Sequence, residues 1–280
     1  MAHLSLRQAR EAYAEELCVI AGLRSPEIIK AFASVPREKF LGPGPWRIGT
    51  EFKRYRTPDD DPRWLYHNVL VTLDAKKGIN NGSPSLWAFL LDKLALKPGE
   101  HVLQVGAGTG YYTAIIATIV GTQGRVTAVE FDRRLAAKAR ANLRGRQQVE
   151  LVHGDAATFD PGQVDAIVVF AGGTHPASLW LERLAPGGRL LMPLVGDDRG
   201  GFVLKIIRHR NGFKAEAVSR CWFVLAEGFR TKHEAHALRK AFASMKGALP
   251  ALRALHIGRP RPSERKEAFF IGRNYWLSRR

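Results

Sequence analysis

Apolar residues recur along most of the chain with two alternating periods. From Pro84 onward, segments with helical spacing alternate with short apolar runs that are typical of buried strands. The pattern predicts helices at 84–96, 110–120, 132–144 and 177–185, and strands at 101–105, 125–130, 149–152, 164–170 and 188–195. Strands that alternate with helices form parallel sheets covered by helices. We therefore expect an α/β fold with a mostly parallel, doubly wound sheet.

The segment before this core has a different pattern. Helical spacing predicts N-terminal helices at 4–23 and 26–35, the second with Ser25 as its N-cap. Residues 42–61 are rich in Pro, Gly and Asp and show no apolar period. Such composition predicts a loop. We expect either an inserted loop or a lid over the core.

After the core, strands at 202–210 and 213–224 are joined by Asn211-Gly212. This dipeptide predicts an antiparallel hairpin at the end of the sheet. A basic helix is expected at 232–246. The tail beyond it contains an apolar segment, 269–276, that is expected to form a strand.

A glycine-rich turn follows the first predicted strand of the core. The strand runs into Gly106, Gly108 and Gly110, and the next helix begins directly afterwards. Glycines allow a tight turn and a close approach of the backbone to a ligand, and the first helical amides point at its polar end. A strand, a glycine turn and a helix in this order predict a nucleotide-cofactor site, although such a turn can also serve only to pack a helix on a sheet.

Two acidic residues at the next strand ends narrow the choice of cofactor. Glu130 ends the second strand, where a carboxylate can accept both ribose hydroxyls, and Asp155 follows the third, where it suits an adenine amino group. Tyr111 stands where a dinucleotide fingerprint has its third glycine, which favours S-adenosylmethionine (AdoMet) over NAD because AdoMet has no pyrophosphate. The predicted cofactor-binding residues are Gly106, Gly108, Gly110, Glu130, Phe131, Asp155 and Ala156.

Composition limits the class of protein. The 280 residues include 43 Lys or Arg and 26 Asp or Glu, for a net charge of +17, and 45% are hydrophobic, as in globular proteins. Residues 201–280 hold 18 basic and 5 acidic residues, a field that attracts acidic partners. The two cysteines and the histidine spacing predict no metal site. No segment has the apolar run of a signal peptide or membrane span, so we expect a cytoplasmic protein that binds no membrane.

Further motifs resemble those of the protein-L-isoaspartate O-methyltransferase family, over roughly residues 5–230. They are Val35–Phe40, Val102–Tyr111, Val126–Glu130, Asp165–Val169 and Leu184–Leu190. The resemblance implies a Rossmann-like AdoMet-dependent methyltransferase fold and a peptide carboxylate as the usual methyl acceptor. The pattern along the chain divides it into N-terminal helices with an inserted loop (1–78), a methyltransferase core (79–230) and a basic C-terminal helix and tail (231–280).

One loop departs from the family pattern. The family carries Gly-x-Thr-Ile-Ser-x-Pro before the first core helix, and its Ser lies between donor methyl and acceptor. Here Gly78 and Pro84 keep the frame, but Gly82 occupies the Ser position. Amide and hydroxyl donors nearby could orient a carboxylate, or the amides could only form a turn or cap the helix. The candidate catalytic residues of this loop are Asn80, Asn81 and Ser83.

His175 is the fourth catalytic candidate. It follows the strand at 164–170 and two glycines, at the carboxyl edge of the sheet, where ligands of doubly wound folds bind. His175 could hold the acceptor, or take a proton if the acceptor is a hydroxyl or an amine. The alternative is an ordinary hydrogen-bonded loop residue.

The sequence thus predicts an AdoMet-dependent methyltransferase that acts on the carboxylate of a protein, a peptide or a small acidic acceptor. An RNA or small-molecule methyltransferase and a non-catalytic AdoMet-binding module are the alternatives. The basic C-terminal region could contact phosphates, but the chain lacks an aromatic-interleaved basic signature of RNA binding. Nucleic acid is therefore the less favoured partner.

Overall fold

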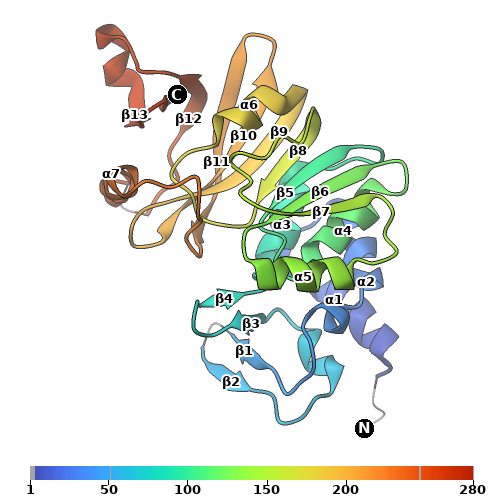
Figure 1. The fold of residues 1–280 in the computed structure, drawn as a ribbon. Helices are drawn as coiled ribbons and strands as arrows, with labels where there is room; N and C mark the ends of the chain where they lie inside the picture. Colours follow the sequence, from blue (N-terminus) through green and yellow to red (C-terminus); the bar gives the residue numbers. More distant parts are fainter. Residues whose placement is uncertain (1–3, 51, 246, 280) are drawn as a thin grey trace. The chain divides into compact units, whose positions relative to one another are not determined.

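The computed structural model describes residues 4–50, 52–245 and 247–279. The chain forms two compact units (Figure 1). Unit 1 comprises Met1–Glu100 and Ala107–His153, and unit 2 comprises His101–Gly106 and Gly154–Arg280. The two units are described in turn.

Unit 1 begins with the two predicted helices, α1 (Leu6–Ala21) and α2 (Pro26–Ser34). Each starts at a serine, Ser5 or Ser25, whose hydroxyl accepts a hydrogen bond from a backbone amide of the first turn. Tyr13, Leu17, Ile28 and Phe32 are buried. A short 3₁₀ helix, η1 (Arg37–Phe40), follows. The N-terminal helices are therefore confirmed, within two residues at each end.

The loop expected at 42–61 is wrong in part, because it carries two strands of a small antiparallel sheet. The sheet has the order β2-β1-β3-β4. Its strands are β1 (Arg47–Gly49), β2 (Arg54–Arg56), β3 (Leu70–Asp74) and β4 (Ile79–Asn80). A short 3₁₀ helix, η2 (Pro62–Leu65), lies between β2 and β3. The strands of the loop have three residues each, and all three residues of β2 are exposed, so no apolar period could develop. A core of Trp46, Ile48, Leu65, Val69 and Val71 holds the sheet.

The rest of unit 1 alternates as predicted. Its elements are α3 (Pro84–Leu94), α4 (Tyr111–Val120), β6 (Arg125–Glu130), α5 (Arg133–Asn142) and β7 (Val149–His153). Strands β6 and β7 are parallel neighbours. Helix α4 is buried at nine of its ten positions, which explains its nearly continuous apolar sequence. Asp132 caps α5 by accepting hydrogen bonds from the amides of Arg134 and Leu135.

Unit 2 contains three parallel strands in the order β5-β8-β9. They are β5 (His101–Val105), β8 (Val164–Val169) and β9 (Leu184–Val195), and α6 (Ser178–Arg183) precedes β9. β9 begins four residues earlier than expected. The hairpin predicted at Asn211-Gly212 is confirmed, since β10 (Gly200–His209) and β11 (Gly212–Trp222) pair antiparallel across it.

The C-terminal segment extends this sheet further than expected (Figure 1). Helix α7 (Lys232–Ala243) is followed by β12 (Leu252–Ile257), η3 (Pro262–Glu267), β13 (Ala268–Ile271) and β14 (Tyr275–Arg279). The order β11-β12-β14-β13 is antiparallel throughout. The single strand predicted at 269–276 is wrong: residues 272–274 form a tight turn, closed by the amide of Gly272 donating to Tyr275 O at 2.8 Å. The apolar run therefore splits into two strands.

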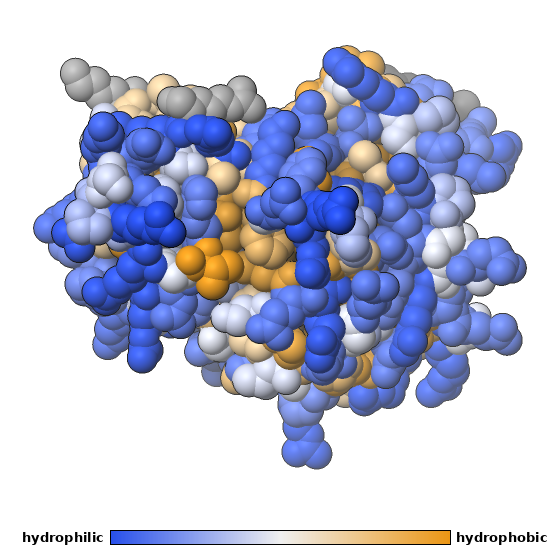
Figure 2. Space-filling view, turned by 90° about the horizontal axis from the view of Figure 1, so that it is seen from above, coloured by the Kyte–Doolittle hydropathy of each residue, from blue (hydrophilic) through white to orange (hydrophobic). Residues whose placement is uncertain are grey.

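The expected α/β architecture is confirmed. Strands alternate with helices, both units contain parallel strand pairs, and two helices stand at the N-terminus. Polar residues cover most of the face seen in Figure 2, with apolar residues showing between them. Among the described residues, no helix is both long and apolar enough to cross a membrane.

Candidate functional site

The glycine turn between β5 and α4 contains residues that serve different purposes. Gly106, Gly108 and Gly110 all have positive φ angles, of 84°, 59° and 94°. A Cβ on Gly110 would lie 2.9 Å from Cδ1 of Leu143, and one on Gly106 would lie 3.4 Å from Cβ of Phe170. Packing against Leu143 therefore requires glycine at position 110, whereas Gly106 is favoured by its positive φ. A Cβ on Gly108 would meet nothing nearer than 3.9 Å, so Gly108 leaves room for a ligand.

Glu130 ends β6 and is tied to this turn. Its side chain is buried, with 7% of the residue exposed. Oε2 accepts a hydrogen bond from the amide of Gly108 at 2.7 Å, and Oε1 accepts one from the amide of Asp132 at 2.9 Å. Burial raises the pKa of Glu130, although the two amides act in the opposite direction. Each carboxylate oxygen can accept a second hydrogen bond, so Glu130 keeps acceptor capacity for ligand hydroxyls. Phe131, the next residue, is 56% exposed.

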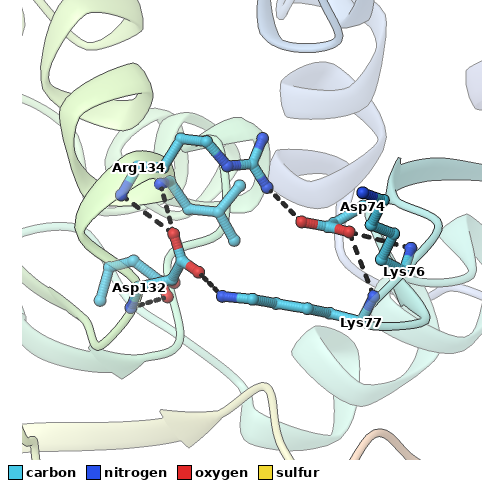
Figure 3. A network of polar contacts seen from close by, with 7 residues as sticks. Asp74, Lys76, Lys77, Asp132 and Arg134 are labelled. Carbon is cyan, nitrogen blue, oxygen red and sulfur yellow. Dashed lines mark hydrogen bonds and ion pairs between the residues drawn. The ribbon is translucent and has the colours of Figure 1, made fainter.

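The hairpin of β3 and β4 is held to the start of α5 by two ion pairs, shown in Figure 3. Nζ of Lys77 lies 2.5 Å from Oδ2 of Asp132, and Nη2 of Arg134 lies 2.6 Å from Oδ2 of Asp74. The hydrogen bond from Lys77 holds the pKa of Asp132 below its ordinary value. Asp132 lies two residues after Glu130, so its ion pair with Lys77 links the hairpin that carries Asn80 to the segment that follows Glu130.

The candidate acceptor loop is built into this hairpin. Oδ1 of Asn80 accepts from the amide of Gly82 at 2.8 Å, so Asn80 forms the turn that the alternative hypothesis described. Oδ1 of Asn81 accepts from the amide of Val71 at 2.7 Å, and the Asn81 amide donates to Val71 O at 2.9 Å. Asn81 is buried, with 8% exposed, and its Nδ2 has no hydrogen-bond partner among the described residues. The NH2 group of Asn81 thus keeps both of its N–H donors unengaged by the described residues.

Gly82 cannot be replaced by the family's Ser without a rearrangement. Its φ is +81°, and a Cβ there would lie 2.5 Å from Nε1 of Trp87. Ser83 holds the N-cap position of α3 but makes no capping hydrogen bond. Its Oγ lies 3.3 Å from Oγ of Ser85, and the residue is half-buried. The hydroxyl at Ser83 is therefore a usable donor, although it stands one residue after the family's position.

In unit 2, Asp155 and Ala156 lie after β7. Oδ1 of Asp155 accepts from the amide of Ala157 at 2.9 Å. A Cβ on Gly228 would collide with the Asp155 carboxylate, so the segment after β11 passes directly beside this acid. The carbonyl of Ala156 accepts from Nε1 of Trp180 at 2.7 Å. Ala156 is buried, and its side chain helps to form this part of the core.

His175, also in unit 2, has a partner that the sequence did not reveal. Its Nδ1 lies 2.8 Å from Oε2 of Glu234, a residue of α7 that is only 4% exposed. The His175 side chain is 28% exposed. The sequence around Glu234 predicts only a basic helix, and no local pattern links residues that lie 59 positions apart. Only the fold brings them together.

Gln104 is a second residue that sequence reasoning missed. It is fully buried in β5, two residues before Gly106, and neither of its amide atoms has a hydrogen-bond partner in the part of the chain that the structure describes. A polar residue inside the apolar run 101–105 was the available signal. Buried amides without partners are rare and expensive, so Gln104 is a candidate contact for a polar ligand group.

The predicted residues are thus distributed over both units. Unit 1 carries Asn80, Asn81, Ser83, Gly108, Gly110, Glu130 and Phe131, and unit 2 carries Gly106, Asp155, Ala156 and His175. The structure brings Glu130 into contact with Gly108. Within unit 1 it also places the three loop candidates on the hairpin that is fastened to α5. Among the described residues, no group of three or more His, Cys, Asp or Glu side chains could hold a metal ion.

The chain is similar to known methyltransferases. The model of the protein-L-isoaspartate(D-aspartate) O-methyltransferase (PCMT) family matches residues 10–229. Protein-L-isoaspartate O-methyltransferase 1 of Rhodopseudomonas palustris is 34% identical over 208 residues, which cover 73% of this chain and 76% of the relative. The enzyme of Methanopyrus kandleri is 34% identical over 196 residues, covering 68% and 78%.

Solved structures share the fold. A protein-L-isoaspartate O-methyltransferase structure aligns with a TM-score of 0.65 at 21% identity and covers 95% of this chain and 88% of its own. A Plasmodium falciparum beta-aspartate methyltransferase (PCMT) in complex with S-adenosyl-L-homocysteine gives a TM-score of 0.61 at 20% identity, covering 77% and 97%. With the family match over most of its length, the chain belongs to the protein-L-isoaspartate(D-aspartate) O-methyltransferase family, which consists of AdoMet-dependent carboxyl methyltransferases.

Proposed function

We propose that this protein transfers the methyl group of AdoMet to the carboxylate of an isoaspartyl residue in a protein or peptide. The observation that supports this most is the hydrogen bond between Glu130 and the glycine turn, in which the buried carboxylate accepts from the amide of Gly108 at 2.7 Å. The open space at Gly108 and the spare lone pairs of Glu130 suit the adenosine of AdoMet.

The residues of the chain fit this cofactor. Glu130 would accept hydrogen bonds from the ribose hydroxyls, and the unpartnered amide of Gln104 offers a donor and an acceptor to a polar group. Asp155 as the partner of the adenine amino group stays a prediction, as do contacts from Phe131 and Ala156. Bound AdoMet supplies an activated methyl group on a sulfonium.

The chain then has to align a carboxylate and exclude water. A carboxylate is ionised at neutral pH and needs no general base. Nδ2 of Asn81 and Oγ of Ser83 are the proposed donors to the acceptor, because both are free of strong hydrogen bonds to the described residues. Asn80 shapes the loop instead, since its oxygen is engaged by Gly82. Fixing reactants in this way can contribute about 7–11 kcal/mol to lowering a barrier.

The test compares acceptors in parallel. Purified protein is incubated with methyl-labelled AdoMet and either an isoaspartyl peptide, the same peptide with normal aspartate, or total RNA. We expect label in the isoaspartyl peptide, and we expect mild base to release it, because methyl esters hydrolyse under these conditions whereas N-methyl groups do not. Label in RNA, or base-stable label, would instead support the alternative acceptors. AdoMet binding without transfer to any acceptor would support a non-catalytic binding module.

A further inference from the structure

The loop that carries His175 is braced by the C-terminal segment, which lies beyond residue 229, where the family match ends. The hydroxyl of Tyr275 in β14 donates to Thr174 O at 2.6 Å, and both groups are buried. Glu234 in α7 contacts His175 directly. The segment outside the family match therefore fixes a loop at the carboxyl end of β8.

Four donors converge on the Glu234 carboxylate. Oε2 accepts from Nδ1 of His175 at 2.8 Å and from the hydroxyls of Thr174 and Thr231, both at 2.9 Å. Oε1 accepts from the amide of Arg273 at 3.0 Å. Burial acts to raise the pKa of Glu234, but the hydrogen bonds from His175, the Arg273 amide and Thr231 outweigh it and lower the pKa to about 2. Glu234 is therefore ionised at neutral pH.

These contacts assign the hydrogen on the imidazole. Thr174 Oγ1 accepts from the amide of Thr231 at 3.1 Å and gives its own hydrogen to Glu234. Thr174 therefore has no hydrogen left to donate to Nδ1 of His175, which lies 3.0 Å away. An ionised Glu234 has none either. Nδ1 must carry a hydrogen, and Nε2 is the atom that His175 can offer to a ligand.

Nε2 of His175 is open to a ligand. No hydrogen bond to Nε2 occurs among the described residues, and the side chain is 28% exposed, so a ligand can reach it. With its hydrogen on Nδ1, the ring donates to Glu234 and leaves the lone pair of Nε2 to accept a hydrogen bond from an N–H of a ligand.

We propose that His175 binds the methyl-accepting peptide by accepting a hydrogen bond from a peptide N–H at Nε2, and that Glu234 is the positioning residue that holds the ring in place. The inference rests on the proposed function. In the transfer, the carbon–sulfur bond breaks with its electron pair going to sulfur, and the carboxylate oxygen forms the new carbon–oxygen bond. The positive charge of the sulfonium and the negative charge of the carboxylate disappear together, and no proton moves. His175 takes no part in these bond changes.

This role predicts which kinetic constant depends on His175. A peptide N–H keeps the same contact before and during transfer, because it takes no part in the bond changes. Losing it should therefore weaken peptide binding more than it slows the chemical step. Substituting a residue with a purely structural role would not change KM selectively while leaving kcat in place.

The test uses His175→Asn, because the Asn amide can still donate to Glu234 from the Nδ1 position but has no group at Nε2. Peptide kinetics are measured with an isoaspartyl peptide, and binding of S-adenosylhomocysteine is measured by calorimetry. We expect KM for the peptide to rise about tenfold to a hundredfold, with kcat within about threefold and cofactor affinity unchanged. Glu234→Gln should raise KM in the same direction.

Thr231→Ala is the matched control. It removes another donor to the same carboxylate oxygen and the N-cap of α7, but it leaves the His175–Glu234 contact in place. Its melting temperature should fall while its KM stays that of the wild type. Wild-type KM in His175→Asn, or an equal rise in KM in Thr231→Ala, would overturn the inference. A wild-type protein that does not methylate the isoaspartyl peptide would overturn the proposed function, and this inference with it.

Discussion

The glycine-turn region and the His175 region each contain a buried glutamate, but the two carboxylates have different partners. Glu130 accepts hydrogen bonds from two backbone amides, whereas Glu234 accepts from three side chains and one amide. Burial raises the pKa of Glu130, while the pKa of Glu234 falls to about 2. Backbone donors leave Glu130 with spare acceptor capacity for a ligand. Glu234 is surrounded by donors and acts through its neighbour His175.

The same contrast extends to the surrounding residues. Asn80 and Asn81 use their side-chain oxygens to accept backbone amides, so the hairpin that carries them has a conformation set by the main chain. The His175 region depends on side chains from the loop, α7 and β14. We therefore expect the first region to be sensitive to backbone changes and the second to changes of charge.

The largest effect is expected from Gly82→Ala. The variant has to hold a non-glycine residue at φ +81° and push Trp87 away from a Cβ that would lie 2.5 Å from its Nε1. The two costs together amount to about 2–4 kcal/mol. Urea unfolding provides the measurement. Gly78→Ala is the matched control, because Gly78 has φ +66° with nothing within 4 Å of its Cβ, and should cost only about 1 kcal/mol.

Equal stability of the two glycine variants would show that the backbone of the hairpin does not constrain Gly82. The comparison also predicts the outcome of Gly82→Ser, which restores the family's residue. It should destabilise the protein rather than improve methyl transfer, because the surrounding residues leave no room for the side chain.

A somewhat smaller effect is expected from Glu234→Gln, and it should depend on pH. The folded-state pKa of Glu234 is about 2, below its ordinary value of 4.5. The ionised group therefore stabilises the folded protein above about pH 4.5, and this contribution is lost as pH falls towards 2. At pH 7 the variant should be less stable by about 2–3 kcal/mol.

Melting temperatures of both proteins between pH 7 and the acid limit of folding provide the measurement. The gap between them should narrow as the pH falls below 4.5. A gap that stays constant over this range would mean that the charge of Glu234 does not stabilise the fold.

The smallest effect is expected from the ion pairs of Figure 3. Lys77 and Arg134 have side chains that are 59% and 47% exposed, so water and salt screen their contacts with Asp132 and Asp74. Lys77→Met and Arg134→Met should each cost less than about 1 kcal/mol. Thermal melts at low and high salt measure this, and the differences should shrink at high salt. A loss of several kcal/mol in either variant would contradict the view that the main chain fixes the hairpin.

The parts of the fold that sequence predicts are those with local causes. The glycine turn, its strand and the acid at Glu130 follow from periodicity and spacing over 101–130, and the strand bounds 101–105 and 125–130 are those of the structure. The strands at Arg47–Gly49 and Arg54–Arg56 could not be predicted, because three exposed or mixed residues contain no period.

Contacts between distant segments were also beyond the sequence. His175 was a candidate because of its place after a strand, but its partner Glu234 sits on a helix whose charged sequence resembles a solvated face. The role of Asn81 depends on Val71, its partner across the hairpin of β3 and β4. The collision at Gly82 depends on Trp87, which the first turn of α3 places beside it. The sequence identified His175, Asn81 and Gly82 as positions of interest, but their contacts are visible only in the folded structure.

The most direct test of the account measures two quantities in two variants: the affinity for S-adenosylhomocysteine by calorimetry, and KM for an isoaspartyl peptide. Glu130→Ala should weaken cofactor binding by about 1–3 kcal/mol, since ribose hydroxyls and the Gly108 amide lose their acceptor. Its peptide KM at saturating AdoMet should stay near wild type. His175→Asn should raise the peptide KM and leave the affinity for S-adenosylhomocysteine unchanged. If both variants lose cofactor and peptide binding to the same extent, or if Glu130→Ala binds the cofactor as the wild type does, the division of roles between Glu130 and His175 is wrong.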